Sequence, residues 1–92
     1  MSDQTRLSAV IRGSVQGVGF RWSVLNVAQD LGLYGYVTNR PDGTVEVVAE
    51  GPPGTVAELE KYLHSGPRSA VVEAVEADHG APTGEFRRFE AK

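Results

Sequence analysis

The sequence predicts an α+β fold in which two helices pack on one face of an antiparallel sheet, with a short strand added at the C-terminus. Segments of alternating apolar and polar residues predict the strands, and two segments with apolar residues at helical spacing predict the helices. Turns rich in glycine and proline separate them. The 92 residues, 40 % of them hydrophobic, suit one core. We therefore take residues 1–92 as a single domain, with the polar residues 1–5 as a flexible tail.

The first third of the chain predicts a strand, a loop and a helix. Residues 7–12 alternate, with the apolar side chains on one face, which is typical of a strand. Residues 13–20 contain three glycines and predict a loop with unusual backbone angles. Apolar residues then follow helical spacing from Phe20 to Leu31, and Gly32 predicts the helix end.

The next segment predicts a β-hairpin. Residues 34–40 favour an extended conformation, and the Pro-Asp-Gly sequence of residues 41–43 predicts a turn. Residues 44–50 alternate again and predict the second strand of the hairpin. Val48 is the exception to this alternation, and it indicates that helices or a partner cover part of the outer face.

The remaining elements complete the fold. Thr55 and Glu58 predict a capping box that starts a second helix, with an apolar stripe at Val56, Leu59 and Leu63. Residues 71–77 predict a fourth strand and residues 85–89 a short fifth one. The order is β-α-β-β-α-β plus a C-terminal strand. Two right-handed crossovers of this kind close into a ferredoxin-like sandwich, a topology that supports many functions.

Composition excludes several classes of protein. The absence of cysteine excludes disulfides and thiolate chemistry, and the two histidines lack metal-ligand spacing. A net charge of −3 argues against binding to nucleic acid or to acidic membranes. No apolar segment typical of a signal peptide follows Met1, and no run approaches the roughly 18 apolar residues of a membrane span. We therefore expect a cytoplasmic protein without a metal or another cofactor. A monomer is a further expectation, and no feature of the sequence indicates the oligomeric state.

The loop between the first strand and the first helix predicts an anion site. Free N–H groups and the helix dipole favour an anion there, and glycines allow the N–H groups to converge. Arg21 follows in the first helical turn, where a cation opposes the dipole by about 0.3–1 kcal/mol. A bound phosphate would resolve this conflict, because arginine can bind the same oxygens. The alternatives are an ordinary tight turn and a solvated arginine.

Two nucleotide motifs do not fit this loop. A P-loop requires GxxxxGK[ST], and no lysine occurs at or near the required position. A dinucleotide-binding loop starting at Gly17 requires a small residue where Trp22 stands. The sequence therefore implies no nucleotide. Trp22 and Tyr36 are interpreted as core or rim packing rather than as residues that stack on a substrate.

Two segments resemble signatures of the acylphosphatase family. Residues 13–21, GSVQGVGFR, resemble the first signature, and residues 35–39, GYVTN, with Gly43, Val45 and Gly51 at the expected spacings, resemble the second. The resemblance implies the βαββαβ fold and the hydrolysis of a small-molecule acyl phosphate to a carboxylate and inorganic phosphate. It implies that Arg21 binds the phosphoryl oxygens and that Asn39 positions the attacking water. The loop residues implied in phosphate binding are Ser14, Val15, Gln16, Gly17, Val18, Gly19 and Phe20. Phe86 and Arg88 share a face where two apolar residues are expected, so the register of the last strand stays open.

The residue types suit this chemistry. An acyl phosphate has a good leaving group, so the protein must mainly hold the phosphoryl group and aim a water in line. Asn39 has no useful pKa and cannot act as a base, but its amide can orient a water. The water's proton can then pass to a phosphate oxygen of the substrate. Without the resemblance, Asn39 would be interpreted as a strand end before a turn.

Two other classes of function remain open. One is a non-catalytic module that binds phosphate or a carbamoyl phosphate fragment for a larger enzyme, although the sequence contains no zinc-finger or transferase portion. The other is an RNA-binding module of the same topology. That module would require aromatic residues on the central strands and a basic face, which this sequence does not show.

Overall fold

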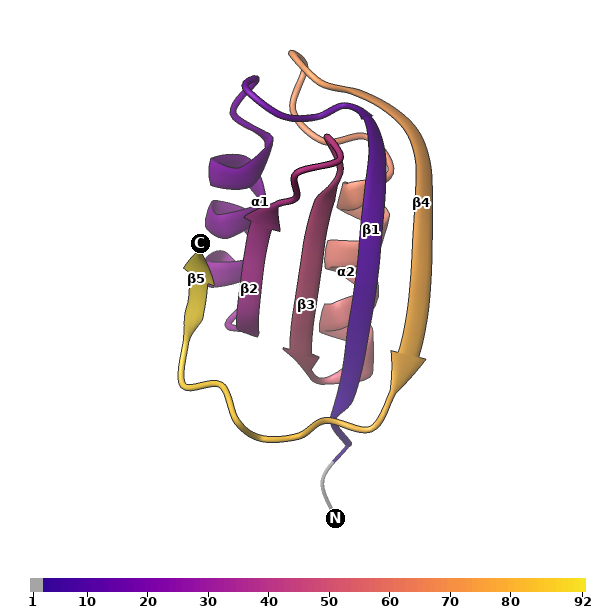
Figure 1. Cartoon of the computed structure of the whole chain (residues 1–92). Helices are drawn as coiled ribbons and strands as arrows, with labels where there is room; N and C mark the ends of the chain where they lie inside the picture. Colours follow the sequence, from indigo (N-terminus) through magenta and orange to yellow (C-terminus); the bar gives the residue numbers. More distant parts are fainter. Residues whose placement is uncertain (1–2) are drawn as a thin grey trace.

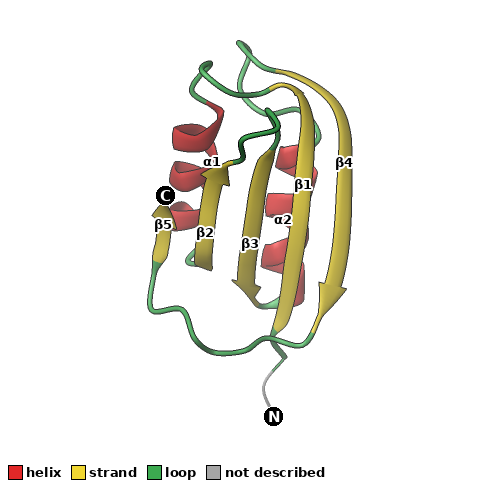
Figure 2. Cartoon of the chain, in the orientation of Figure 1, coloured by secondary structure: helices red, strands yellow, loops and turns green. Residues whose placement is uncertain are grey.

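The computed structural model describes residues 3–92 and consists of two layers, a five-stranded sheet and two helices that cover one of its faces (Figure 1; Figure 2). The predicted α+β, ferredoxin-like order of elements is confirmed. The elements are β1 (Thr5–Ser14), α1 (Phe20–Asp30), β2 (Tyr34–Asn39), β3 (Val45–Gly51), α2 (Pro53–Leu63), β4 (Val71–Gly80) and β5 (Phe89–Ala91). Residues 1 and 2 of the predicted tail lie outside the described residues, and Thr5 already pairs with Gly51 in the sheet.

The strands follow the order β4-β1-β3-β2-β5. Among the first four, each strand is antiparallel to its neighbour, as predicted, whereas β5 pairs in parallel with β2, with Phe89 opposite Gly35. The predicted limits of the last strand, residues 85–89, are wrong, because the strand begins only at Phe89. The strand starts late because residues 81–88 must cross the end of the sheet from β4 at one edge to β5 at the other (Figure 1).

The start of α2 also differs from the prediction. The helix begins at Pro53, with Pro52 as its N-cap, and no side chain caps it. Thr55 therefore lies inside the first turn, and the predicted capping box does not form. Proline suits the first helical position because its φ angle is already helical and it has no N–H group to satisfy. The N–H group of Val56 donates to the carbonyl of Pro52 over 2.9 Å and closes this turn.

The core lies between the helices and the inner face of the sheet. The alternating strand residues and both helical stripes supply it, as the periodicity predicted. Its fully buried larger side chains are Leu7, Ile11, Val15, Phe20, Val24, Val37, Val45, Val47, Val56, Leu59 and Leu63. No helix in the described part of the chain is long and apolar enough to cross a membrane.

The segment between β4 and β5 covers part of the opposite face. Phe86 packs edge-on against Tyr36, with ring centroids 5.9 Å apart, and Tyr36 lies opposite Val48, which is buried. Glu50 accepts hydrogen bonds from the backbone N–H groups of Thr83 and Gly84. The cover predicted from Val48 is therefore supplied by the chain itself rather than by helices or a partner. We call Glu50, its ion-pair partner Arg6, and Thr83 and Gly84 the Glu50 cluster.

Candidate active site

The glycine loop, residues 14–20, joins the end of β1 to the start of α1. It lies at the same end of the sheet as the β2–β3 turn and the α2–β4 connection (Figure 1). Gly17 and Gly19 have φ angles of 74° and 80°, a left-handed conformation that other residues adopt only with strain. Gly19 is the N-cap of α1, and no side chain caps this helix. The helix therefore presents free N–H groups to whatever lies in front of it.

Side chains hold the loop from both sides. The Gln16 amide donates to the carbonyls of Arg40 and Thr44 in the β2–β3 turn, over 2.7 and 2.8 Å. The Ser69 hydroxyl donates to the carbonyl of Val18 over 2.6 Å. Among the loop and turn hydrogen bonds of residues 3–92, none is donated by the backbone N–H groups of residues 17–19. The anchors thus use side chains and carbonyl oxygens and leave these N–H groups free.

Arg21 lies in the first turn of α1. One guanidinium nitrogen, Nη1, donates to the main-chain oxygen of Lys92 over 2.8 Å, so the residue that follows β5 fixes the orientation of the side chain. The Nε atom is buried and has no hydrogen-bond partner in the described part of the protein. Leaving a buried donor unpaired costs about 1–3 kcal/mol, more for a charged group. An anion in front of the helix would supply the missing acceptor.

Arg21 and Asn39 line one hollow of about 150 Å³. Asn39 ends β2 on the face that is turned toward the helices, and the predicted turn with its glycine follows it. Of the residues predicted for the site, the structure brings together Val15, Gly17, Gly19, Phe20, Arg21 and Asn39. The other three do not line the hollow. Ser14 pairs with Val71 in the sheet, the Gln16 side chain bonds to the β2–β3 turn, and Val18 packs against the core.

Trp22 also lines the hollow, whereas its predicted role was packing in the core or at its rim. It is 60 % exposed and so does not belong to the core. The sequence contained a signal for this position. Trp22 lies two residues after Phe20 and therefore about 200° around the helix, away from the apolar stripe.

Among the described residues, no carboxylate or imidazole lines the hollow. The nearby Asp42 belongs to the β2–β3 turn, where its carboxylate accepts hydrogen bonds from the Thr44 hydroxyl over 2.6 Å and from the Thr44 N–H group over 3.0 Å. These bonds, that of the hydroxyl first, lower the pKa of Asp42. Within residues 3–92, no three His, Asp or Glu side chains gather where they could hold a metal ion.

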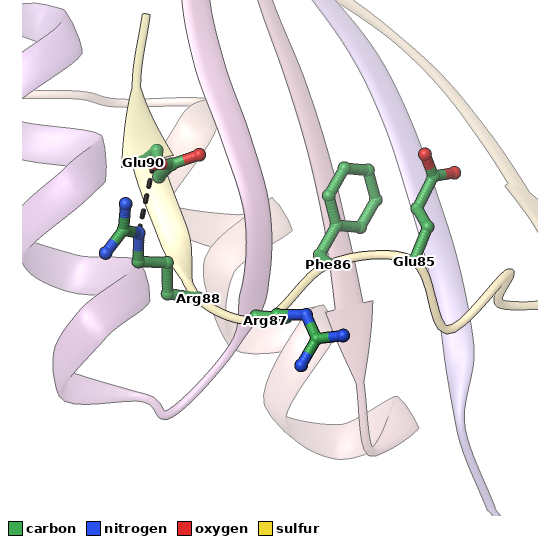
Figure 3. A pocket seen from close by; sticks show the side chains of 5 residues that line it. All are labelled: Glu85, Phe86, Arg87, Arg88 and Glu90. Carbon is green, nitrogen blue, oxygen red and sulfur yellow. Dashed lines mark hydrogen bonds and ion pairs between the residues drawn. The ribbon is translucent and has the colours of Figure 1, made fainter.

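A wider hollow of about 510 Å³ lies along the segment that leads into β5 and is lined by Glu85, Phe86, Arg87, Arg88 and Glu90 (Figure 3). In Figure 3 the side chains of Glu85 and Phe86 project away from that of Arg87, and Arg88 pairs with Glu90 over 3.0 Å. This hollow contains none of the residues that the sequence predicted for the site. Its charged side chains do not converge on one point, so we do not take it as the functional site.

Comparison with known proteins identifies the family to which the two sequence motifs point. A sequence model of the acylphosphatase family matches residues 7–91. An acylphosphatase of Trichormus variabilis is 45 % identical over 91 residues, which is 99 % of this chain and 89 % of that protein. One of Thermus thermophilus is 51 % identical over 79 residues, covering 86 % and 90 % of the two chains. The crystal structure of acylphosphatase from Bacillus subtilis superposes with a TM-score of 0.92 at 31 % identity and covers 96 % of this chain and 98 % of its own. With its fold, its two motifs and these full-length similarities in agreement, the chain belongs to the acylphosphatase family.

Proposed function

We propose that this chain hydrolyses acyl phosphates, with Arg21 and the N–H groups of the glycine loop holding the phosphoryl group and Asn39 positioning the water. Membership of the acylphosphatase family supports the reaction. The roles of the residues are supported chiefly by one observation. Arg21, Asn39 and the uncapped start of α1 meet at the same small hollow.

The phosphoryl group would bind where the charges of the protein favour it. Nη1 of Arg21 is held by the main-chain oxygen of Lys92, so the guanidinium group is oriented before the substrate arrives. Its buried Nε then gains an acceptor, as do the N–H groups of residues 17–19. Donors that are fixed in advance stabilise the charge that spreads over the phosphoryl oxygens without a reorganisation cost during the reaction.

Asn39 would hold a water opposite the leaving group. The water oxygen attacks phosphorus, the bond between phosphorus and the acyl oxygen breaks, and the acyl group leaves as a carboxylate. The proton of the water passes to a phosphate oxygen, so the products are the carboxylate and inorganic phosphate. This scheme needs no protein base, which agrees with a hollow that has no carboxylate or imidazole in its lining.

Turnover of an acyl phosphate by Arg21→Ala and Asn39→Ala tests the two roles. Loss of one good donor costs about 2.7–4 kcal/mol, so we expect Arg21→Ala to lower kcat/KM by about 10²–10³-fold and to abolish competitive inhibition by inorganic phosphate. Misplacement of the water should lower kcat of Asn39→Ala by about 10²-fold while phosphate still inhibits. Arg12→Ala and Asn26→Ala, exposed residues outside the hollow, are the matched controls. An equal loss in Arg12→Ala, or full activity in Arg21→Ala, would refute the assignment.

The remaining expectations belong to the same proposal. The enzyme should need no metal, so EDTA should leave turnover unchanged, and a loss with EDTA would contradict the scheme. We also propose a cytoplasmic monomer that acts on a small molecule without nucleic acid or membrane. The net charge of −3 supports the absence of nucleic acid. Gel filtration measures the oligomeric state, and retention of RNA at low salt measures binding to nucleic acid.

A further inference from the structure

The side chain of Trp22 is exposed and lies beside the proposed active site. Three large apolar side chains of the described chain are exposed, namely Trp22, Tyr34 and Val71. Of these, Trp22 alone lines the hollow that also contains Arg21 and Asn39. A single exposed apolar residue needs no explanation by itself. Its position beside the two proposed working residues is the observation that calls for one.

The geometry of α1 directs the indole toward the glycine loop. Side chains of a helix lean toward its N-terminus, so a residue in the first turn covers the turn that precedes it. For Trp22 this is the turn that contains Gly19 and the free N–H groups. The space in front of Gly17 and Gly19 is open, because a Cβ atom added to either would meet no atom within 4 Å. The indole therefore borders an unfilled space beside the proposed phosphoryl site.

The two ends of an acyl phosphate differ in chemistry, and so do the two parts of this hollow. The phosphoryl end is charged and suits Arg21 and the N–H groups. The acyl end is uncharged in simple acyl phosphates such as acetyl and benzoyl phosphate. The remaining side chains of the lining are apolar: Val15 and Phe20 are buried, which leaves Trp22 as the exposed apolar surface. A planar acyl group can stack on an indole or meet it edge-on, whereas an acetyl group has little surface to offer.

We infer that Trp22 is a specificity-determining residue that binds the acyl group, so that the enzyme prefers acyl phosphates with a planar aromatic acyl group to those with a small aliphatic one. This inference rests on the proposed function. It assigns to Trp22 a contact with the substrate instead of the packing role predicted from the sequence.

The first test compares benzoyl phosphate with acetyl phosphate in the wild type, Trp22→Ala, Trp22→Phe and Tyr34→Ala. From the usual strength of aromatic pairs, Trp22→Ala should lower the ratio of the two kcat/KM values about three- to ten-fold, and Trp22→Phe should restore most of it. Tyr34→Ala, which removes an exposed aromatic side chain outside the hollow, should leave the ratio unchanged. An unchanged ratio in Trp22→Ala overturns the inference.

The second test measures binding without turnover. Trp22 is the only tryptophan of the chain, so its fluorescence reports on this site directly. Benzylphosphonate should bind more tightly than methylphosphonate and change the emission, and equal affinities for the two overturn the inference. The failure of the underlying function would look different, because the wild type would then hydrolyse neither acyl phosphate, or Arg21→Ala would hydrolyse both as well as the wild type.

Discussion

Replacing Glu50 by glutamine should destabilise the protein more than any exposed substitution of the same kind. Glu50 is only 5 % exposed, and its carboxylate accepts hydrogen bonds from Nη1 of Arg6 over 2.8 Å and from the N–H groups of Thr83 and Gly84 over 3.0 and 3.1 Å. Glutamine has nearly the same size but offers one acceptor oxygen, and its NH2 group faces donors. The change therefore removes the negative charge of the cluster and leaves its donors, including the Arg6 cation, in place.

The expected loss can be estimated from these contacts. A hydrogen bond to a charged group contributes about 1.5–3 kcal/mol, and breaking a fully buried pair costs about 3–5 kcal/mol. The Arg6 side chain is 24 % exposed and can regain water, so the lower range applies. We expect a fall of about 2–3 kcal/mol in the free energy of unfolding, a large share of the roughly 5 kcal/mol or a little more that a domain of this size possesses.

Urea denaturation of Glu50→Gln and of the control Glu73→Gln measures this loss. Glu73 is exposed on β4, so its substitution should change the free energy of unfolding by less than about 0.5 kcal/mol. A Glu50→Gln variant as stable as the control would show that the Glu50 cluster does not fasten the segment between β4 and β5. The reasoning from buried, charge-assisted hydrogen bonds would then be wrong for this protein.

The same residue predicts a dependence on pH. Burial raises the pKa of Glu50, but the N–H groups of Thr83 and Gly84, the Arg6 guanidinium group and the Thr83 hydroxyl together hold it below its ordinary value. A carboxyl group whose pKa is lower in the folded state stabilises the fold above its unfolded pKa of about 4.3 and loses this contribution as the pH falls through the folded pKa. The stability difference between wild type and Glu50→Gln should therefore shrink below about pH 4. A difference that stays constant down to pH 3 would contradict this assignment.

Further substitutions test the loop and the core. Gln16→Ala removes two hydrogen bonds to the turn that follows Asn39, and we expect kcat to fall about ten-fold, whereas Gln29→Ala, which removes a single longer bond to Phe89, should leave kcat unchanged. Equal rates in the two variants would show that the Gln16 anchor does not matter for turnover. Leu59→Ala should lower the free energy of unfolding by about 2–5 kcal/mol in urea denaturation, because Leu59 is fully buried, and a loss below about 1 kcal/mol would mean that the core collapses around the cavity.

Most of the fold could be predicted because local pattern and tertiary packing agree. The stripe that begins at Phe20 and the alternation in β1 and β3 both place apolar side chains in the core. The errors occurred where two local signals compete or where the partner is distant in sequence. At the start of α2, the pre-set backbone of Pro53 took precedence over a plausible cap at Thr55. The limits of β5 depend on how residues 81–88 cross the sheet, and their fastening to Glu50 has no local signal.

Part of the candidate site could be predicted for the opposite reason, because its residues depart from local structural preference. The glycine loop and Arg21 conflict with the local preferences of a helix start, and such conflicts are expected at functional sites. Asn39 was assigned only through the resemblance of its segment to a known family. The position of Trp22 beside Asn39 depends on the packing of α1 against β2. A short segment of sequence does not specify such packing. The contact of Arg21 with Lys92 likewise joins residues that are 71 positions apart.

The two ends of the central strand β3 lie in parts of the molecule with different roles, one in the proposed function and one in stability. Val45 at one end lies opposite Asn39, and Glu50 near the other end lies opposite Tyr34, about 17 Å further along the strand. The proposed active site lies at the first end, and the contacts that fasten the crossing segment lie at the second. Thermal tolerance can therefore be adjusted by substitution around Glu50 without the trade-off between stability and activity that arises when both depend on the same residues.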